Sequence, residues 1–245
     1  SEGSKARINK ISFLGNGALG TKALKKTMKT KRKKWIIGGK FDEAKLNADL
    51  DSIISDYGNI GRLEAEITKT DLVFTPNGKG MALSIYLSEG PEYSIDTLEI
   101  DNNIVFDEDE LLALLGVDAG DIHDRGQIAT DRTAIENQYQ SNGYVNAQVR
   151  VQETLNRENK TTAVVHRISE GSLKYIRQLN ISGNDTTKDE VIRRELLVVP
   201  SERFDGSAVS ESERRLANTG PPRDGDEFSG GNAERQVFKN GFVVI

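Results

Sequence analysis

The sequence ISFLGN at residues 11–16 returns as LEIDNN at residues 98–103 and as LNISGN at residues 179–184. Each copy places apolar residues at its first and third positions and ends in Gly-Asn or Asn-Asn, a pattern typical of a short strand followed by a tight turn. Successive copies start 87 and 81 residues apart, a spacing that suits a small independent domain rather than one unit of a solenoid. The chain is therefore predicted to consist of three small repeats in a row.

Within the first repeat, helix and strand patterns follow one another in a clear order. A polar helix is predicted from residue 21 to about residue 28. Two strands are predicted at residues 62–68 and 81–87, where apolar and polar residues alternate. Before these strands, one apolar face of a second helix is formed by Leu46, Leu50, Ile53, Ile54 and Tyr57.

The later repeats show weaker copies of the same order. Ile128, Ile135 and Tyr139 lie in register with the second helix, and residues 145–152 alternate like its following strand. The third repeat keeps a shorter helical pattern, with Val209 and Leu216.

A helix layer and a sheet each bury one apolar face, so neither is stable without the other. The predicted fold class is therefore α+β: three tandem β-α-α-β-β domains, each a three-stranded mixed sheet covered on one face by two helices. The expected domains are residues 6–90, 91–171 and 172–245. Residues 221–245 form an atypical tail, in which Asn240-Gly241 predicts a β-hairpin; the alternative is a disordered or non-native tail.

Composition argues against several classes of function. The chain has no Cys, a net charge of −5 and only two His, so thiolate chemistry is excluded and nucleic acid is not an expected partner. His123 is expected in a solvated loop and His166 at an inward strand position, and neither context suggests a nucleophile. No catalytic, cofactor-binding or metal-binding residue is predicted, and no enzyme activity or cofactor is expected.

One basic cluster runs against the acidic balance of the chain. It predicts either a site for anionic lipid or an acidic partner, or simply a solvated helix end and loop. Its members, with no acid among them, are Lys22, Lys25, Lys26, Lys29, Lys31, Arg32, Lys33 and Lys34.

Three short motifs stand in a recognisable order and spacing. They are Met28-Lys29-Thr30-Lys31, then Asn142-Gly143-Tyr144 with Ala147, then Gly183-Asn184-Asp185-Thr186 followed by residues 191–195. Together with the repeat pattern, they resemble the last three POTRA domains of the BamA family of outer-membrane β-barrel assembly proteins. The resemblance covers about residues 6–220.

The resemblance implies a place on the periplasmic side of the bacterial outer membrane. Its implied partners are unfolded outer-membrane β-barrel precursors, received by β-augmentation, and accessory lipoproteins of the assembly complex. The family continues into a membrane β-barrel, and contact with the membrane is expected only through that barrel, which residues 1–245 do not include. The alternatives are the POTRA region of a related transporter, of the two-partner secretion or TamA kind, and a structural spacer.

Two sets of residues are the candidates for these contacts. The edge strand of the first repeat is expected to bind the client, although Glu64 and Glu66 are equally expected to repel strand pairing. In the third repeat, Arg193, Arg194 and Glu195 match the motif implied to dock a lipoprotein, the alternative being a solvated helix end. The client-binding candidates are Arg62, Leu63, Glu64, Ala65, Glu66, Ile67 and Thr68.

Overall fold

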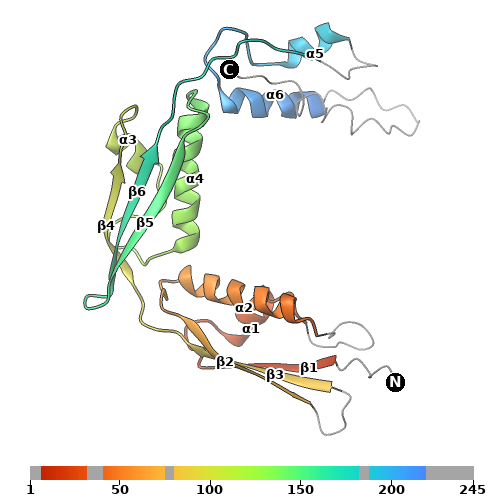
Figure 1. Cartoon of the computed structure of the whole chain (residues 1–245), viewed down its shortest axis with the longest axis vertical. Helices are drawn as coiled ribbons and strands as arrows, with labels where there is room; N and C mark the ends of the chain where they lie inside the picture. The colour runs from red at the N-terminus through yellow and green to blue at the C-terminus, as the bar shows by residue number, and fades with distance from the viewer. Residues whose placement is uncertain (1–6, 32–40, 75–79, 182–187, 219–245) are drawn as a thin grey trace, which may run out of the picture. The chain divides into compact units, whose positions relative to one another are not determined.

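A computed structural model describes residues 7–31, 41–74, 80–181 and 188–218 (Figure 1). It confirms the predicted α+β class, because these residues include two three-stranded sheets together with helices. The described residues pack into two compact units. One draws on the described residues within 1–99, 116–130 and 153–165, and the other on those within 100–115, 131–152 and 166–218.

The first repeat contains a mixed sheet of three strands. Its central strand is β3 (Gly80–Ser88), which pairs in parallel with β1 (Arg7–Leu14) and antiparallel with β2 (Glu66–Phe74). Strands β1 and β2 are therefore the two edges of this sheet. Helices α1 (Thr21–Thr27) and α2 (Glu43–Gly58) cover one face of it, as predicted (Figure 1).

The core of this repeat lies between the sheet and its two helices. Ile53 and Tyr57 of α2 are fully buried in one cluster with Leu24 of α1 and with Leu83 and Ile85 of β3. Burying one aliphatic or aromatic side chain of this size stabilises a fold by about 1.5–3 kcal/mol. The helical face predicted from the sequence is thus the face that packs on the sheet.

The turn after the first strand takes the backbone conformation that the opening motif predicts. Gly15 has a φ of +88°, and Asn102, at the same place in the second repeat, has a φ of +67°. Glycine adopts this left-handed region without a steric penalty, and Asn adopts it more readily than most residues. At Gly15 an added Cβ would lie 2.1 Å from the carbonyl oxygen of Leu87, so the backbone approaches too closely for a side chain.

The second repeat contains the second sheet, with strand order β4-β6-β5. The strands are β4 (Ser94–Asp101), β5 (Gln148–Asn156) and β6 (Thr161–Ser169), and the helices are α3 (Glu108–Leu112) and α4 (Arg125–Ser141). Acidic side chains fill the first turn of α3, where they suit the positive end of the helix dipole. One cluster of buried side chains includes Ile100, Leu111, Ile135, Tyr139, Val149 and Ile168.

The third repeat is described mainly by two helices, α5 (Asp189–Glu195) and α6 (Gly206–Asn218). Ile176 and Val198 belong to its buried cluster, and Tyr175 forms an isolated antiparallel bridge with Arg203. The hairpin predicted around Asn240-Gly241 lies outside the described residues.

The prediction of a strand at residues 62–68 is wrong in its boundaries. After Gly61, which has a φ of +75°, the chain turns before β2 begins at Glu66. The amide of Arg62 donates to the carbonyl of Tyr57 at 2.9 Å, and the amide of Ala65 donates to the carbonyl of Arg62 at 3.1 Å. These bonds hold residues 62–65 in a turn, although their side chains alternate as in a strand.

Candidate functional site

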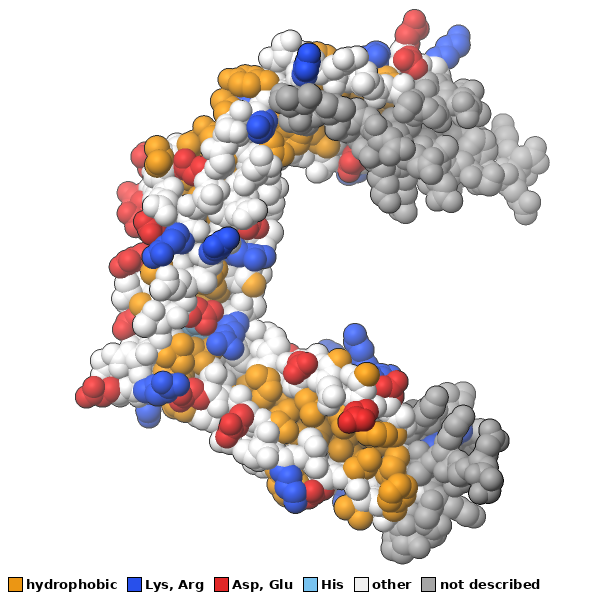
Figure 2. All heavy atoms as spheres, viewed as in Figure 1, with side chains coloured by type: hydrophobic (Ala, Val, Ile, Leu, Met, Phe, Trp, Pro, Cys, Tyr) orange, Lys and Arg blue, Asp and Glu red, His pale blue; other side chains and the backbone are white. Residues whose placement is uncertain are grey.

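Strand β2 is an edge strand whose second half is regular and partly apolar. A β-bulge between Ile67 and Lys69 interrupts its pairing with β3, and the pairing then continues without a break to Phe74. The strand ends in Leu72, Val73 and Phe74, of which the last two are 61% and 62% exposed. Figure 2 shows hydrophobic side chains gathered on the surface of this repeat beside residues drawn in grey.

This edge has the chemistry needed to bind an extended polypeptide. No described strand pairs with the outer side of β2, so its outward N–H and C=O groups are open to a further strand. Main-chain hydrogen bonds of this kind place little demand on the sequence of the incoming strand. The exposed Val73 and Phe74 add apolar contact at one end, while Lys69 and Asp71 form a 2.8 Å ion pair on the same strand.

The structure separates the predicted client-binding residues into two groups. Glu66, Ile67 and Thr68 lie on the β2 edge, whereas residues 62–65 lie in the preceding turn. There a guanidinium nitrogen of Arg62 donates to the carbonyl of Gly90 at 2.7 Å. Another nitrogen of the same guanidinium lies 3.7 Å from Oε2 of Glu92, so the turn contacts the start of the second repeat.

Glu64 is not a free outward charge on the edge strand, as the sequence suggested. Its carboxylate accepts a hydrogen bond from the hydroxyl of Tyr93 at 3.0 Å and another from Nε of Arg157. Arg157 first, and Tyr93 second, lower the pKa of Glu64. Both partners belong to the second repeat, so Glu64 serves the link between repeats rather than repelling a client strand.

That link is built from backbone hydrogen bonds that recur. The carbonyl of Gly61 accepts from the amide of Tyr93 at 2.9 Å, and the carbonyl of Tyr93 accepts from the amide of His123 at 3.0 Å. The link between the second and third repeats contains the equivalent bonds. The amide of Lys174 donates to the carbonyl of Gly143 at 2.8 Å, and the amide of Phe204 donates to the carbonyl of Lys174 at 3.0 Å. Gly61 and Gly143, which precede the second strand of the first two repeats, are the sequence signal for this geometry.

A tyrosine–glutamate pair fixes the loop after the first strand. The hydroxyl of Tyr57 donates to Oε1 of Glu89 at 2.8 Å, and the amides of Gly17 and Ala18 donate to the same oxygen at 2.7 and 2.9 Å. Burial opposes ionisation of Glu89, but these hydrogen bonds outweigh it and lower its pKa. Burial, together with the bond to Glu89, raises the pKa of Tyr57 well above its usual value.

The second repeat contains the same pair, which sequence reasoning missed. The hydroxyl of Tyr139 donates to Oε1 of Glu170 at 2.8 Å, and the amides of Ile104 and Val105 donate to that oxygen at 2.7 and 2.8 Å. The available signal is the sequence Ser-Glu-Gly, at residues 88–90 and again at 169–171, whose Glu follows a helical Tyr by 32 and by 31 residues.

The predicted docking residues lie together on the short helix α5. Arg193 and Arg194 are exposed, and Glu195 is half-buried. Nε of Arg194 lies 3.4 Å from Oε1 of Glu195, an exposed ion pair of the kind that contributes little to stability. The arrangement leaves the guanidinium groups of Arg193 and Arg194 exposed on the surface of α5.

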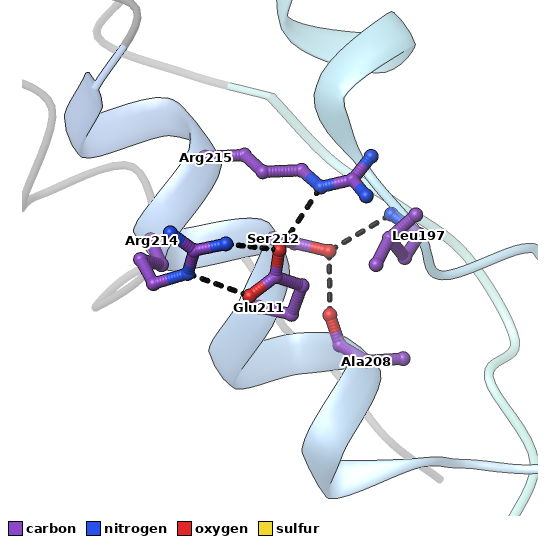
Figure 3. Close-up of polar contacts among 6 residues, drawn as sticks. All are labelled: Leu197, Ala208, Glu211, Ser212, Arg214 and Arg215. Carbon is purple, nitrogen blue, oxygen red and sulfur yellow. Dashed lines mark hydrogen bonds and ion pairs between the residues drawn. The ribbon is translucent and has the colours of Figure 1, made fainter.

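Polar side chains of α6 form hydrogen bonds and ion pairs within the helix and with the segment that follows α5 (Figure 3). The buried hydroxyl of Ser212 accepts from the amide of Leu197 at 2.8 Å and donates to a carbonyl one turn earlier in α6. Glu211 pairs with Arg214 and Arg215, and these hydrogen bonds lower the pKa of Glu211 to about 2. Arg214 and Arg215 of α6 are thus already paired, whereas no ion pair of Arg193 is found among the described residues.

The prediction that His123 is solvated is wrong, because its side chain is fully buried. Nδ1 lies 2.9 Å from the hydroxyl of Thr162, and Nε2 lies 3.7 Å from Oε1 of Glu153, so segments distant in sequence enclose it. His166 is buried in its strand, at the inward position that was expected.

Neither a metal-binding cluster nor a membrane-spanning helix is present in the part of the chain that the structure describes. Within it, no group of three or more His, Asp or Glu side chains is placed to hold a metal ion. Nor does any helix there combine the length and the apolar character needed to cross a bilayer.

These features define a class of protein: an array of small α+β modules with open sheet edges, linked by recurring backbone bonds. The family model for POTRA, described as surface antigen variable number repeat, matches residues 6–90, 93–171 and 174–221. The chain belongs to the POTRA family.

Its relatives point more narrowly to BamA. The outer membrane protein assembly factor BamA of Neisseria meningitidis serogroup B is 30% identical over 221 residues, which cover 88% of this chain and 28% of that protein. A putative outer membrane protein assembly factor of Treponema pallidum is 28% identical over 89% of this chain and 26% of its own length. The chain thus spans about a quarter of these relatives.

A solved structure of similar extent gives the same result. The crystal structure of POTRA domains 3–5 of BamA from Haemophilus influenzae matches with a TM-score of 0.69 and 28% identity, covering 93% of this chain and 92% of that one. The resemblance to BamA POTRA domains inferred from the sequence motifs is confirmed.

Proposed function

We propose that this chain is the periplasmic receptor region of an outer-membrane protein assembly factor, on the inner side of the bacterial outer membrane. Its relatives carry the name of such factors, and its fold is similar to POTRA domains 3–5 of BamA. Its partners are unfolded outer-membrane β-barrel precursors and accessory lipoproteins. The precursors add as a further strand to an open sheet edge and pass toward the membrane.

One observation carries this proposal: the open β2 edge of the first repeat. The client site is residues 66–74, which replaces the predicted 62–68 because the earlier residues lie in the turn. The regular stretch from Lys69 to Phe74 accepts the client backbone, and the exposed Val73 and Phe74 contact its apolar side chains.

Val73→Lys is expected to weaken binding of a peptide from a β-barrel strand by roughly tenfold, because a charged edge residue opposes strand addition and removes apolar contact. The measurement is an NMR titration that follows the amides of residues 66–74. The matched control is Ile104→Lys, which changes another exposed apolar residue, 88% accessible, in the second repeat. Unmoved amides at 66–74 in the unsubstituted chain would remove this edge from the proposal.

A second contact in the same function is docking of an accessory lipoprotein on α5. Arg193 is exposed, whereas Arg214 and Arg215 of α6 are paired with Glu211. Arg193 is therefore the cation best placed to meet a carboxylate of the partner, and Arg194 and Glu195 flank it on the same helix.

Arg193→Glu is expected to weaken pull-down of the helical-repeat lipoprotein of the assembly complex several-fold, because a cation facing the partner's carboxylates becomes an anion. Circular dichroism is expected to stay unchanged, since the residue is exposed. The control is Arg177→Glu, which reverses another exposed charge of the third repeat outside α5. Equal pull-down by both variants would contradict the assignment of Arg193.

The second candidate function is a structural spacer, favoured by the recurring backbone bonds at Gly61 and Gly143. In that role three modules, bounded at residues 6–90, 91–171 and 172–245, hold partners at a set distance from the membrane. The peptide titration separates the two functions, because a spacer binds no client at residues 66–74.

A further inference from the structure

The first sheet has a second open edge, on strand β1. A bulge lies between Ile8 and Lys10, and from Lys10 to Leu14 the strand pairs with β3 without interruption. The other side of β1 faces no described strand. Alternate residues of this stretch therefore present N–H and C=O groups to any extended chain beside them.

An open groove runs between this edge and helix α1. Its volume is about 390 Å³, and it is lined by β1 and by the start of α1. Ile11 and Phe13 supply its apolar part, Thr21 is exposed at its side, and an exposed lysine stands on each wall: Lys10 from β1 and Lys25 from α1. A peptide lying along β1 would thus meet positive charge on both sides.

The lysines of this groove lie in a part of the sequence that has no acidic residue. The sequence from residue 3 to residue 41 contains twelve Lys or Arg and no Asp or Glu. Among the described residues, no carboxylate oxygen lies within 4.0 Å of the side-chain nitrogens of Lys10, Lys22, Lys25 and Lys26.

Carboxylates near α1 are bonded to other groups. Asp49 accepts from the amides of Lys29 and Thr30 at 2.7 Å each, and Asp56 accepts from the hydroxyl of Thr27. Lys31 also differs from the lysines of the groove, because its Nζ donates to the carbonyls at the end of α1. Lys10 and Lys25 are thus the charged side chains that line the groove, and no described carboxylate forms an ion pair with them.

We propose that the β1–α1 groove binds an extended acidic polypeptide segment, which pairs with the edge of β1 and places its carboxylates against Lys10 and Lys25. The open backbone groups favour a polypeptide over a lipid headgroup, and the lysines on both walls select Asp- or Glu-bearing chains. The β2 edge differs in being apolar at its end and carrying a paired Lys69. This inference does not rest on client binding at β2.

The test is an NMR titration of the whole chain with a synthetic peptide of alternating Glu and Thr. We expect shifts at residues 9–14 and in α1, and affinity that falls with added salt. Lys10→Gln combined with Lys25→Gln is expected to weaken binding roughly fivefold, because two exposed ion pairs are lost. The matched control, Lys45→Gln with Lys188→Gln, removes the same charge elsewhere and is expected to bind as the unsubstituted chain does.

Further probes distinguish the contribution of ionic contacts from that of backbone pairing, and binding of a peptide from binding of a lipid. The acidic peptide is also made in two versions, one with its odd-numbered amides N-methylated and one with its even-numbered amides N-methylated. Only one of the two versions is expected to lose binding, because only one set of amides faces β1. Equal binding of an alternating Lys and Thr peptide would overturn the proposal. So would binding of phosphatidylglycerol vesicles through Lys10 and Lys25 without any peptide shift at residues 9–14.

Discussion

Replacing Gly15 with Ala is expected to lower the free energy of unfolding of the first repeat by about 3 kcal/mol or more. Gly15 has a φ of +88°, and its added Cβ would lie 2.1 Å from the carbonyl oxygen of Leu87, a backbone atom of the central strand. The strand end or the turn must move to relieve that overlap. Hydrogen exchange of β3 amides in the whole chain measures the effect within this repeat.

The matched control is Gly20→Ala, five residues further along the same loop. Gly20 has a φ of −65°, and an added Cβ there meets no atom within 4 Å. Its effect is therefore expected to stay within about 0.5 kcal/mol. Equal protection of β3 amides in the Gly15 and Gly20 variants would show that the close approach to Leu87 does not limit stability.

The elements that could be predicted from the sequence are those fixed by local chemistry. The apolar face of Leu46, Ile53 and Tyr57 recurs with the period of a helix, and Ile53 and Tyr57 are fully buried in α2. The Gly or Asn after the first strand predicts a left-handed turn, and Gly15 and Asn102 adopt it. In both cases the sequence pattern that predicts the structure lies within one short segment of the chain.

The client edge could be predicted only in part, because its position depends on backbone bonds. Leu63 and Ala65 alternate with polar residues as in a strand, but bonds to the carbonyls of Tyr57 and Arg62 hold them in a turn. Conversely, Val73 and Phe74 are adjacent apolar residues. The alternation of apolar and polar residues that predicts a strand is therefore missing there, although both residues lie in β2.

Contacts between distant segments explain the remaining errors. The Gly- and Asp-rich surroundings of His123 are typical of a solvated loop, yet Thr162 and Glu153 enclose its ring. Likewise, the sequence around Glu64 is typical of a charged residue that prevents pairing at an edge strand. The carboxylate instead accepts hydrogen bonds from Tyr93 and Arg157 of the second repeat. Neither partner is near in sequence, so no local pattern contains this information.

Glu89→Ala is expected to destabilise the first repeat by about 2 kcal/mol at neutral pH, because three donors lose a charged acceptor. The donors are the hydroxyl of Tyr57 and the amides of Gly17 and Ala18. Hydrogen exchange of the β3 amides reports the loss. Glu99→Ala, which removes an exposed carboxylate from the next strand, is the control and is expected to change stability by less than about 0.5 kcal/mol.

The pH dependence of the Glu89 variant gives an independent check. Because the folded-state pKa of Glu89 lies below its ordinary value, its carboxylate stabilises the fold fully above the unfolded pKa of about 4.3. That contribution is lost as the pH falls through the lower, folded pKa. The stability difference between the unsubstituted chain and Glu89→Ala is therefore expected to shrink in acid. A difference that stays constant from neutral to acidic pH would mean that the lost side chain acts through packing and not through its charge.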